Sequence, residues 1–272
     1  MPEGPEIKRE AYRIAQAIEG AELEKVFFAR RDLKKFQSRL NGARVSSVAP
    51  HGKAMLIHFD NEWVMYSHNQ LYGRWFVRPR GELPKTNRTL RAALHSRDHS
   101  ALLYSASEIE VLRPSALAAH PFLKKLGPDA LDANTHWRMV SARLQERRFS
   151  GRTLGALLLD QSFVAGLGNY LRTEILFFAG LSPERKPRDL STKERNRLAR
   201  EILDVTQRAY DQGGVTNKPA LVKKLKKSGA KRGGVRFSAF ARANKPCYRC
   251  KTIIKKIEFS GRRLYVCGSC QV

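Results

Sequence analysis

Four cysteines constrain the fold of this 272-residue chain more than any other feature. All of them fall in the last 26 residues, with the spacing C-x2-C-x16-C-x2-C: Cys247, Cys250, Cys267 and Cys270. Two close pairs separated by such an interval are typical of a tetrahedral four-thiolate zinc site. A pair of disulfides is the alternative, and a reducing cytosolic environment disfavours it. The stretch between the pairs alternates like a strand, so we expect one structural Zn²⁺ per chain that clasps a β-hairpin.

The chain also carries a large excess of positive charge. Lys and Arg number 51 against 25 Asp and Glu, which gives a formal net charge of +26. A solubilising surface needs far less charge, so the excess indicates a polyanionic partner. A membrane surface is a weaker candidate, because the basic residues are spread through the whole chain. No segment reaches the ~18 consecutive apolar residues of a membrane span, and charged residues interrupt the N-terminus where a signal peptide would be apolar. We therefore expect a soluble, cytoplasmic protein without membrane contact.

Short segments with strand character dominate the first 112 residues. Eight of them are separated by turn residues: 23–30, 43–50, 54–59, 63–67, 73–77, 90–95, 102–105 and 109–112. Segments of this length and spacing are typical of an antiparallel sandwich or barrel. Apolar residues at helical spacing precede them and predict one leading helix: Ile7, Ala11, Ile14, Ala15 and Ile18.

The periodicity becomes helical after a turn-rich connection at 114–132. Helices are expected at 135–147, 154–161, 169–179 and 192–210. Thr135 and Asn169 are candidate N-caps, and Ser191 with Glu194 forms a candidate capping box. The Gly- and Lys-rich stretch 213–234 is expected to be mobile or only partly helical without a partner. The prediction is an α+β multidomain protein with an antiparallel β-sandwich domain at 1–126, a helical domain at 127–243 and a zinc finger at 244–272.

The N-terminal sequence MPEGPE offers a candidate nucleophile. Loss of Met1 before the small Pro2 leaves a secondary amine, and an α-amine with a pKa of roughly 7.7–8.0 is partly unprotonated near neutrality. An iminium formed by a secondary amine has no N–H to lose, so its positive charge is fixed and acidifies the neighbouring C–H. Glu3 can then serve as general acid or base. The run 4–6 predicts a helix start with Gly at N-cap and Pro at N1, whose positive end lowers the amine pKa and attracts phosphate. An ordinary processed terminus before a buried helix is the alternative.

Two further places hold candidate ligand-binding residues. The helices expected at 154–161 and 169–179 are joined through a glycine-rich turn, and Asn169 at the second helix start offers an amide and free backbone N–H groups to a phosphate. A plain helical hairpin with Asn169 as its cap explains the pattern equally well. Lys53 follows a glycine between two strands and can reach a ligand from a rigid turn. By position alone, one more exposed lysine is the commoner explanation.

The sequence Gln70-Leu71-Tyr72 lies between two predicted strands. A bulky apolar side chain at a turn tip, flanked by an amide and an aromatic ring, can enter a DNA stack as a wedge. An enzyme that flips a base out of the duplex must stabilise the gap that the base leaves. The alternative is a hairpin turn whose Leu71 packs on the core.

Taken in order, these motifs resemble the formamidopyrimidine-DNA glycosylase and endonuclease VIII family, and the match runs essentially end to end. The segments that carry the resemblance are MPEGPE at 1–6, Gly-Lys at 52–53, SHNQLYG at 67–73, Asp-Gln at 160–161, GLGNYL at 166–171 and the four cysteines. The N-terminal run and the Gln-Leu-Tyr turn look closer to the endonuclease VIII branch of the family.

The resemblance implies a β-sandwich, a helix-two-turn-helix domain with a zinc-finger hairpin, and double-stranded DNA bound in a basic cleft between the domains. It implies a monomeric DNA glycosylase and AP lyase that removes oxidised pyrimidines, also acts at abasic sites, and cleaves the strand by β,δ-elimination. No redox cofactor or catalytic metal is needed, so the zinc is expected to be structural.

The resemblance also implies roles for individual residues. Pro2 matches the Schiff-base nucleophile, Glu3 the acid that assists base loss, and Lys53 the proton donor of β-elimination. Arg262 matches the finger arginine of δ-elimination, and its neighbour Arg263 leaves that assignment open by one position. The expected DNA contacts are Gln70, Leu71, Tyr72, Lys125 and Asn169.

Two departures and two rival functions accompany the resemblance. The stretch 213–234 is longer and more basic than the family pattern, which can alter lesion preference, and the last cysteine knuckle (267–270) lacks a proline. An oxidised-purine glycosylase is the rival within the family. A non-catalytic zinc-finger nucleic-acid-binding protein is the rival from another class, but it gives no reason for Pro2 beside Glu3 or for Lys53 at its turn.

Overall fold

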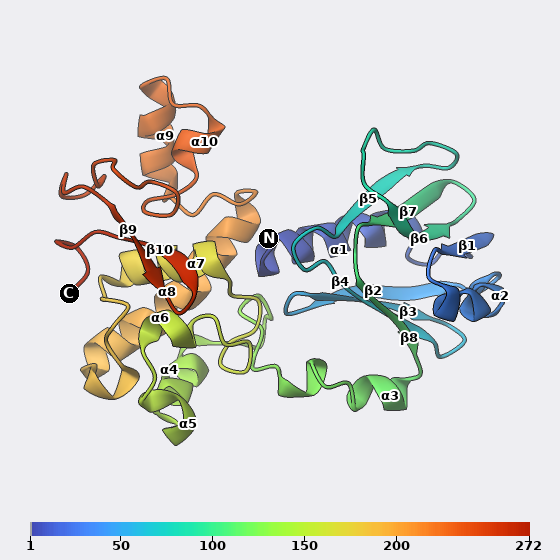
Figure 1. The fold of residues 1–272 in the computed structure, drawn as a ribbon, viewed down its shortest axis with the longest axis horizontal. Helices are drawn as coiled ribbons and strands as arrows, with labels where there is room; N and C mark the ends of the chain where they lie inside the picture. Colours follow the sequence, from blue (N-terminus) through green and yellow to red (C-terminus); the bar gives the residue numbers. More distant parts are fainter. Residues whose placement is uncertain (1) are drawn as a thin grey trace. The chain divides into compact units, whose positions relative to one another are not determined.

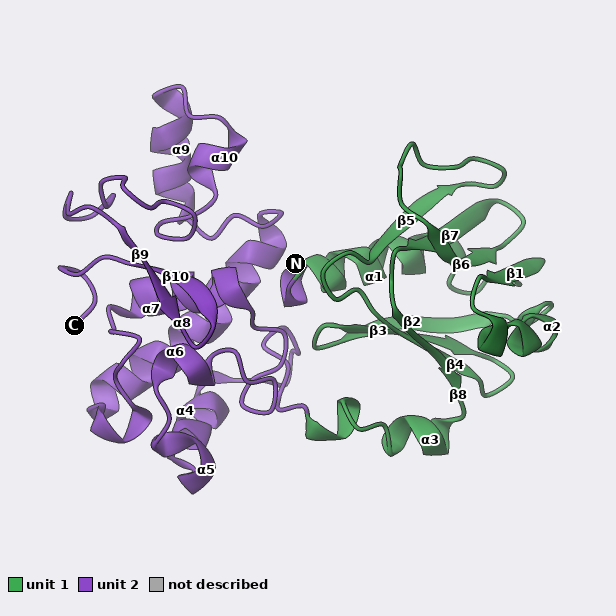
Figure 2. Ribbon diagram, viewed as in Figure 1, with its two compact units in different colours: residues 1–2, 6–125 green, residues 3–5, 126–272 purple. Residues whose placement is uncertain are grey.

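The computed structural model describes residues 2–272, so the expected removal of Met1 lies outside the described residues. The chain divides into two compact units (Figure 2). Unit 1 holds Pro2 and residues 6–125, and unit 2 holds residues 3–5 and 126–272. Helix α1 (Gly4–Ile18) therefore begins in unit 2 and continues in unit 1. Within the described part of the chain, no helix combines the length and apolar character that membrane crossing requires.

Unit 1 is a sandwich of two four-stranded antiparallel sheets (Figure 1). One sheet has the order β1-β6-β7-β5 and the other β2-β3-β4-β8. The strands are β1 (Lys25–Phe28), β2 (Val45–His51), β3 (Ala54–Phe59), β4 (Val64–His68), β5 (Arg74–Pro79), β6 (Leu90–His95), β7 (His99–Tyr104) and β8 (Glu108–Leu112). The short helical segments of the unit are η1 (Arg31–Phe36), α2 (Gln37–Leu40), α3 (Pro114–Ala118) and η2 (Leu123–Lys125). All eight predicted strands are present, and β3 and β6 have the predicted ends.

The core of unit 1 lies between α1 and the two sheets. Helix α1 buries Ile7, Ile14 and Ile18 on one side, as their spacing predicted. These side chains pack with residues from both sheets, including Phe28 and Ile57, in a single apolar cluster. This packing fixes the N-terminal helix on the sandwich and thereby orients the polar residues on its other sides.

Unit 2 consists of helices and a C-terminal two-stranded hairpin (Figure 1). Its helical segments are α4 (Trp137–Gln145), α5 (Arg147–Ser150), α6 (Leu154–Leu157), α7 (Asn169–Ala179), η3 (Pro187–Asp189), α8 (Thr192–Asp211), α9 (Pro219–Lys227) and α10 (Arg232–Val235). The hairpin pairs β9 (Lys255–Phe259) with β10 (Arg262–Val266). Helix α8 packs against α4 and α7. Cys247, Ile254 and Cys267 are buried in the same apolar cluster as these helices, so the finger shares the core of unit 2.

The helix starts test the capping predictions. The capping box of α8 is confirmed, because the Ser191 hydroxyl accepts from the Glu194 N–H and the Glu194 carboxylate accepts from the Ser191 N–H. Thr135 as a cap is wrong: α4 starts after His136, whose ring Nδ1 accepts from the backbone N–H of Met139 at 3.2 Å. The helix predicted at 135–147 is also interrupted, since an extended residue at 146 separates α4 from α5.

Two glycine-containing starts differ from expectation in the same way. Helix α1 begins at Gly4, so the residue predicted as N-cap is already helical. Helix α7 begins at Asn169, and the N-cap is Gly168 in an extended conformation. Asn169 as the cap of α7 is therefore wrong. The basic stretch 213–234 contains α9 and the first three residues of α10, in agreement with partial helix formation.

Candidate active site

Pro2 lines a positively charged cavity of unit 1. The residue is half-buried, and the cavity has a volume of about 280 Å³. Its other lining residues are Glu6, Arg9, Glu10, Arg13, Leu71, Tyr72, Gly73, Arg74, Trp75 and Arg88. Four of these are arginines, of which Arg9 forms an ion pair with Glu6 at 3.0 Å. The surplus of guanidinium groups makes the cavity attractive to an anion such as a phosphate.

The Glu3 carboxylate is held at the N-terminus of α7, within unit 2. Its Oε1 accepts a hydrogen bond from the Tyr170 backbone N–H at 2.8 Å, and its Oε2 accepts one from the Leu171 N–H at 3.2 Å. These N–H groups belong to the first helical turn, where no carbonyl of the helix can reach them. They lie at the positive end of the helix dipole, so the arrangement stabilises an anionic carboxylate and fixes its position.

Glycines allow this close approach of Glu3 to α7. A Cβ on Gly168 would lie 2.3 Å from Cδ of Glu3, a distance that no side chain permits. The Gly4 N–H donates to the carbonyl of Gly166 at 2.8 Å, and Gly166 has a φ of +89°, which favours glycine. Gln161 stabilises the loop, because its Oε1 accepts from the Gly166 N–H at 3.1 Å and its Nε2 donates to the Leu167 carbonyl at 2.9 Å. The glycine-rich motif therefore builds the seat of the Glu3 carboxylate.

Arg172 connects α7 to the finger hairpin. Its side chain is fully buried and donates from Nη1 to the Phe259 carbonyl and from Nη2 to the Arg263 carbonyl, both at 3.3 Å. Burial and, to a smaller extent, the charge of Arg262 lower the pKa of Arg172 to about 10, while the charge of Glu3 opposes the shift. Both Arg262 and Glu3 therefore act electrostatically on the same buried guanidinium.

The hairpin turn determines where Arg262 is placed. Ser260 and Gly261 both have positive φ, 53° and 67°, as in the two-residue turns that match strand twist. Arg262 follows directly and pairs with Phe259. Neighbouring residues of a strand point to opposite faces, so Arg262 and Arg263 face different ways. Arg262 is the one whose charge acts on the pKa of Arg172.

Asn169 uses both ends of its amide inside unit 2. Its Nδ2 donates to the Arg263 carbonyl at 2.8 Å, and its Oδ1 accepts from Nη2 of Arg172 at 2.6 Å. The side chain thus joins the start of α7 to the finger. Asn169 is the first residue of α7, and the backbone N–H groups of the next two residues hold the Glu3 carboxylate.

Lys53 is buried, with 8 % of its surface exposed. It lies in the two-residue turn between β2 and β3, where His51 pairs with Ala54 and Gly52 has a φ of +62°. Its ammonium group lies close enough to His68 to contribute, after burial, to the lowered pKa of that imidazole. The interpretation of Lys53 as an ordinary exposed surface lysine is therefore wrong.

The turn after β4 presents two exposed apolar side chains. Leu71 and Tyr72 are 62 % and 68 % exposed, so packing of Leu71 on the core is wrong. A hydrogen bond from the Gln70 N–H to the ring Nδ1 of His68 at 3.0 Å orders the turn, and Gln70 has a φ of +46°. A Cβ on Gly73 would lie 2.6 Å from backbone atoms of the turn, so glycine is required where the turn closes. A firm turn with an exposed apolar tip suits a wedge.

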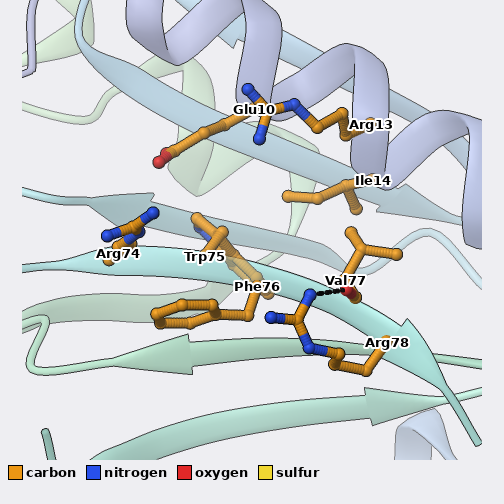
Figure 3. Close-up of a pocket in the computed structure, with 8 residues that line it drawn as sticks. All are labelled: Glu10, Arg13, Ile14, Arg74, Trp75, Phe76, Val77 and Arg78. Carbon is orange, nitrogen blue, oxygen red and sulfur yellow. Dashed lines mark hydrogen bonds between the residues drawn. The ribbon is translucent and has the colours of Figure 1, made fainter. Parts of the chain in front are cut away.

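A half-buried carboxyl group on α1 holds the base of this turn. Asn69 Nδ2 donates to Glu10 Oε2 at 2.7 Å. Glu10 extends from α1 toward β5, and it lines one pocket with Arg13 of α1 and with Arg74 and Trp75 of β5 (Figure 3). Burial raises the pKa of Glu10 from 4.5 to about 7, although the Asn69 hydrogen bond and the charges of Arg13 and Arg74 oppose the shift. Near neutrality the carboxyl group is therefore partly protonated.

This shift predicts a pH-dependent stability of unit 1. An acid with a raised pKa in the folded state stabilises the fold fully below the unfolded pKa of about 4.5 and loses that contribution as pH rises through about 7. The loss amounts to at most about 3 kcal/mol, since one pKa unit corresponds to ~1.4 kcal/mol. Glu10→Gln keeps the acceptor for Asn69 and cannot ionise, so the variant should be more stable than the native protein at pH 8 and equally stable near pH 4.5.

Urea denaturation across this pH range measures the effect, with Glu22→Gln at an exposed position as the control for the removed charge. The native protein and the control should lose stability together above pH 5, while the Glu10→Gln curve stays flatter. Parallel curves for all three proteins would contradict the assignment.

The four cysteines form a metal site. Their Sγ atoms all lie within 4.8 Å of one another, and the closest separations are 3.3 Å for Cys250–Cys267 and 3.4 Å for Cys250–Cys270. Thiolates at ~2.3 Å from a tetrahedral Zn²⁺ are about 3.8 Å apart, so the arrangement fits zinc. A disulfide requires about 2.05 Å, so the disulfide alternative is wrong. Among residues 2–272 this is the one cluster with metal-ligand geometry.

Lys125, the last predicted DNA contact, is the final residue of η2 and is exposed. It lies at the end of unit 1.

Sequence reasoning missed several residues of this site. Arg172, Gln161 and Glu10 each bind a segment that carries a predicted functional residue. Arg172 had a usable signal, because Arg172 and Glu174 are charged residues in a largely apolar helix. Glu10 had none, since it reads as an ordinary polar position of an amphipathic helix.

Protein-family models and full-length relatives match this chain. The N-terminal domain model of formamidopyrimidine-DNA glycosylase matches residues 1–107, the H2TH domain model of the same enzyme matches 126–219, and a zinc finger found in FPG and IleRS matches 244–272. The chain is 47 % identical to endonuclease 8 of Shigella sonnei and 46 % identical to endonuclease 8 of Escherichia coli O9:H4, over the full length of each.

Solved structures share the fold. The formamidopyrimidine glycosylase of Lactococcus lactis, in complex with DNA containing N7-benzyl-Fapy-dG, matches with a TM-score of 0.82 at 20 % identity and covers 99 % of both chains. The same enzyme with oxidised-pyrimidine DNA matches with a TM-score of 0.81 at 20 % identity over 99 % of both chains.

A β-sandwich followed by a helical unit with a zinc finger, matched over the full length by the endonuclease 8 relatives, defines a DNA repair enzyme with glycosylase and AP lyase activity. The chain belongs to the formamidopyrimidine-DNA glycosylase family, and its endonuclease 8 relatives place it in base excision repair. The predicted fold class and the structural zinc site are confirmed.

Proposed function

We propose that this enzyme removes oxidised pyrimidines from double-stranded DNA through a Schiff base on the Pro2 amine, and then cleaves the strand by β,δ-elimination. The observation that carries the proposal is the Glu3 carboxylate, which two backbone N–H groups of α7 fix one residue from Pro2. A nucleophilic amine needs a base that takes its proton and an acid that gives one to the leaving group. A fixed carboxylate adjacent in sequence can do both in turn.

The chemistry balances with these groups. The unprotonated Pro2 nitrogen attacks C1′ of the sugar, the C1′–N bond breaks, and the base leaves with a proton. Glu3 accepts a proton from the Pro2 ammonium beforehand and supplies it to the departing base. The attached nitrogen then gives up its remaining N–H proton, which Glu3 passes to O4′ as the C1′–O4′ bond breaks and the C=N bond forms. The resulting iminium carries a fixed positive charge, which acidifies the C2′–H.

Loss of the C2′ proton expels the 3′ phosphate, and a second elimination expels the 5′ phosphate. Hydrolysis of the iminium then restores the amine. Lys53, buried at its turn, is assigned to proton donation in the first elimination. Arg262, the first residue of β10 after the hairpin turn, is assigned to the second, with Arg263 as the alternative.

The remaining predicted residues bind DNA in this proposal. Leu71 acts as the wedge, with Gln70 and Tyr72 beside it, and both Leu71 and Tyr72 are exposed as a wedge requires. Lys125 and Asn169 contact the backbone. The net charge of +26 supports a duplex as the partner. The protein is proposed to act as a monomer in the cytoplasm with the chromosomal DNA, without membrane contact. The zinc holds the finger that carries Arg262 and takes no part in the bond changes.

Leu71→Gly tests the substrate and the wedge together. Duplexes with an oxidised pyrimidine, an oxidised purine or an abasic site are assayed for base release and strand cleavage. The native enzyme should release the oxidised pyrimidine fastest. The variant should lose about tenfold or more in excision and much less in cleavage at the abasic site, because an abasic nucleotide leaves the stack at little cost.

Leu83→Gly, the same substitution at another exposed leucine of unit 1, is the matched control and should behave like the native enzyme. Faster release of the oxidised purine would move the enzyme to the rival substrate class. Equal losses on lesion and abasic duplexes would remove the wedge role from Leu71.

A further inference from the structure

Residues 218–236, which we call the basic arm, leave the body of unit 2 and return to it at one point. The side chain of Glu174 on α7 is fully buried and holds both ends. Its Oε2 accepts from the Thr216 hydroxyl at 2.6 Å and from the Ser238 N–H at 2.8 Å, and its Oε1 accepts from the Ala239 N–H at 2.8 Å. A carboxylate with this many donors is a strong anchor, so the arm has a fixed base.

Further hydrogen bonds tie the arm to the rest of unit 2 and to the finger. Asn217 Nδ2 donates to the Val235 carbonyl at 2.9 Å, which closes the base of the arm. Tyr248, between the first two cysteines, donates from its hydroxyl to the Gly234 carbonyl at 3.0 Å. The arm is therefore held to the same structural unit as α7 and the zinc finger.

The arm itself projects into solvent. Helices α9 and α10 stand out from the rest of unit 2 (Figure 2), and α9 buries none of its residues. Leu221, Val222 and Leu225 are partly covered on one side of α9. The other side carries exposed lysines: Lys223, Lys224, Lys226 and Lys227. With nine residues α9 is about 14 Å long, and a duplex carries one charge per ~1.7 Å of its axis, so the helix can face several phosphates.

No acidic residue of the arm or of the neighbouring sequence offsets the positive charge of the arm. No Asp or Glu occurs between Asp211 and Glu258. Lysines at i, i+3 and i, i+4, such as Lys223 with Lys226 and Lys227, repel one another and weaken a helix. The helix dipole offsets part of this cost, because these lysines lie in the last turns. A polyanion that approaches the lysine face would offset the rest.

We propose that the lysine face of the basic arm binds the phosphates of duplex DNA beyond the damaged nucleotide, as an accessory contact that adds affinity without reading the lesion. The inference rests on the proposed function only in its choice of duplex DNA as the polyanion. A fixed base and an exposed face of one charge are what such a contact needs, since phosphate contacts position a protein and carry no sequence information.

Duplex length and salt separate this contact from the active site. The arm variant replaces four side chains: Lys223→Gln, Lys224→Gln, Lys226→Gln and Lys227→Gln. The control removes the same charge elsewhere: Lys25→Gln, Lys34→Gln, Lys35→Gln and Lys193→Gln, all at exposed positions. Affinities for undamaged duplexes of about 12 and about 30 base pairs, one helical turn and three, are measured against salt.

The native protein and the control should bind the longer duplex more tightly than the shorter one. The gain in affinity should exceed the gain that the larger number of binding positions on the longer duplex produces. The arm variant should bind the long duplex about tenfold more weakly and the short one almost normally. Its log–log salt slope should be shallower by about 0.9 for each phosphate that the arm no longer neutralises. Replacement of the same four lysines by arginine should restore the native values. Excision of a lesion from the short duplex, where the native protein shows it, should be unchanged in the arm variant.

Equal losses in the arm variant and the control would show a general charge effect and overturn the proposal. A native slope and affinity in the arm variant would identify the lysines as a solvated surface. Circular dichroism and thermal unfolding of each variant establish that α9 remains folded, so that a loss is assigned to charge. Binding by the native protein without any lesion excision would refute the proposed function and leave the arm test intact.

Discussion

Sodium borohydride will join this protein covalently to duplex DNA that carries an oxidised pyrimidine or an abasic site, and will leave intact duplex unlinked. Attack of the Pro2 amine on the sugar must pass through an iminium. Hydride adds to the carbon of that C=N bond and leaves a stable tertiary amine between protein and DNA. A denaturing gel then shows one slower band that contains both.

Blocking the N-terminus gives the largest expected loss. A retained Met1 or an N-terminal tag converts the Pro2 nitrogen to an amide without nucleophilicity, so trapping and base release should both fall by on the order of 10³ or more. The same tag at the C-terminus is the matched control and should have no effect. Glu3→Gln should lose base release by about 10²–10⁴, yet keep some trapping at an abasic site, where the base has already left.

Two outcomes would contradict the assignment of Pro2. Robust trapping by a chain with a blocked N-terminus would move the nucleophile to a lysine, and Lys53 would be tested first. Absence of trapping on every lesion, with a free Pro2 verified by mass spectrometry, would favour the non-catalytic zinc-finger protein.

Loss of the zinc site should unfold the finger and loosen unit 2. Structural zinc supplies on the order of 10 kcal/mol in isolated finger peptides. Cys247 is fully buried in the core that α7 and α8 share, so Cys247→Ser removes a metal ligand and places a hydroxyl in an apolar cluster. The variant should hold well under one zinc per chain and bind DNA weakly.

Unit 1 should remain folded in this variant because its core contains no residue of the finger. Ser269→Ala, between two ligands but with its hydroxyl bonded to Thr252 at 2.8 Å, is the matched control and should keep its zinc. Full metal content and native DNA binding in Cys247→Ser would contradict a four-thiolate structural site. Treatment of the native protein with a chelator should reproduce the variant.

The sequence by itself determined the elements whose signals are local. Alternation of apolar residues located all eight strands of unit 1, and the ends of β3 and β6 coincide with those predicted. The capping box of α8 was readable because its partners, Ser191 and Glu194, are three positions apart. The cysteine spacing predicted the zinc site for the same reason: the ligands of each pair lie on one turn of the chain.

The residue types of the candidate site were also visible in sequence, although several roles came from the family resemblance and not from spacing. Pro2 and Glu3 stand out because an N-terminal secondary amine next to a carboxylate has a definite chemistry. Thr135 and Asn169 were misassigned as caps because His136 and Gly168 occupy those positions, and a cap is decided by which side chain or backbone reaches the free N–H groups.

Only the tertiary structure decided which distant groups meet. The Glu3 carboxylate bonds to the N–H of Tyr170, 167 positions away, and no periodicity encodes such a contact. Lys53 is buried and Leu71 is exposed, the reverse of what is common for a lysine and a leucine. Residue type gives only a tendency to be buried, whereas the packing of the whole unit decides the burial of a particular side chain. Glu174 likewise joins Thr216 to Ser238, and this long-range anchor gives the basic arm a fixed base. Local patterns depend on neighbours within a few residues, whereas these contacts exist only after the chain has folded.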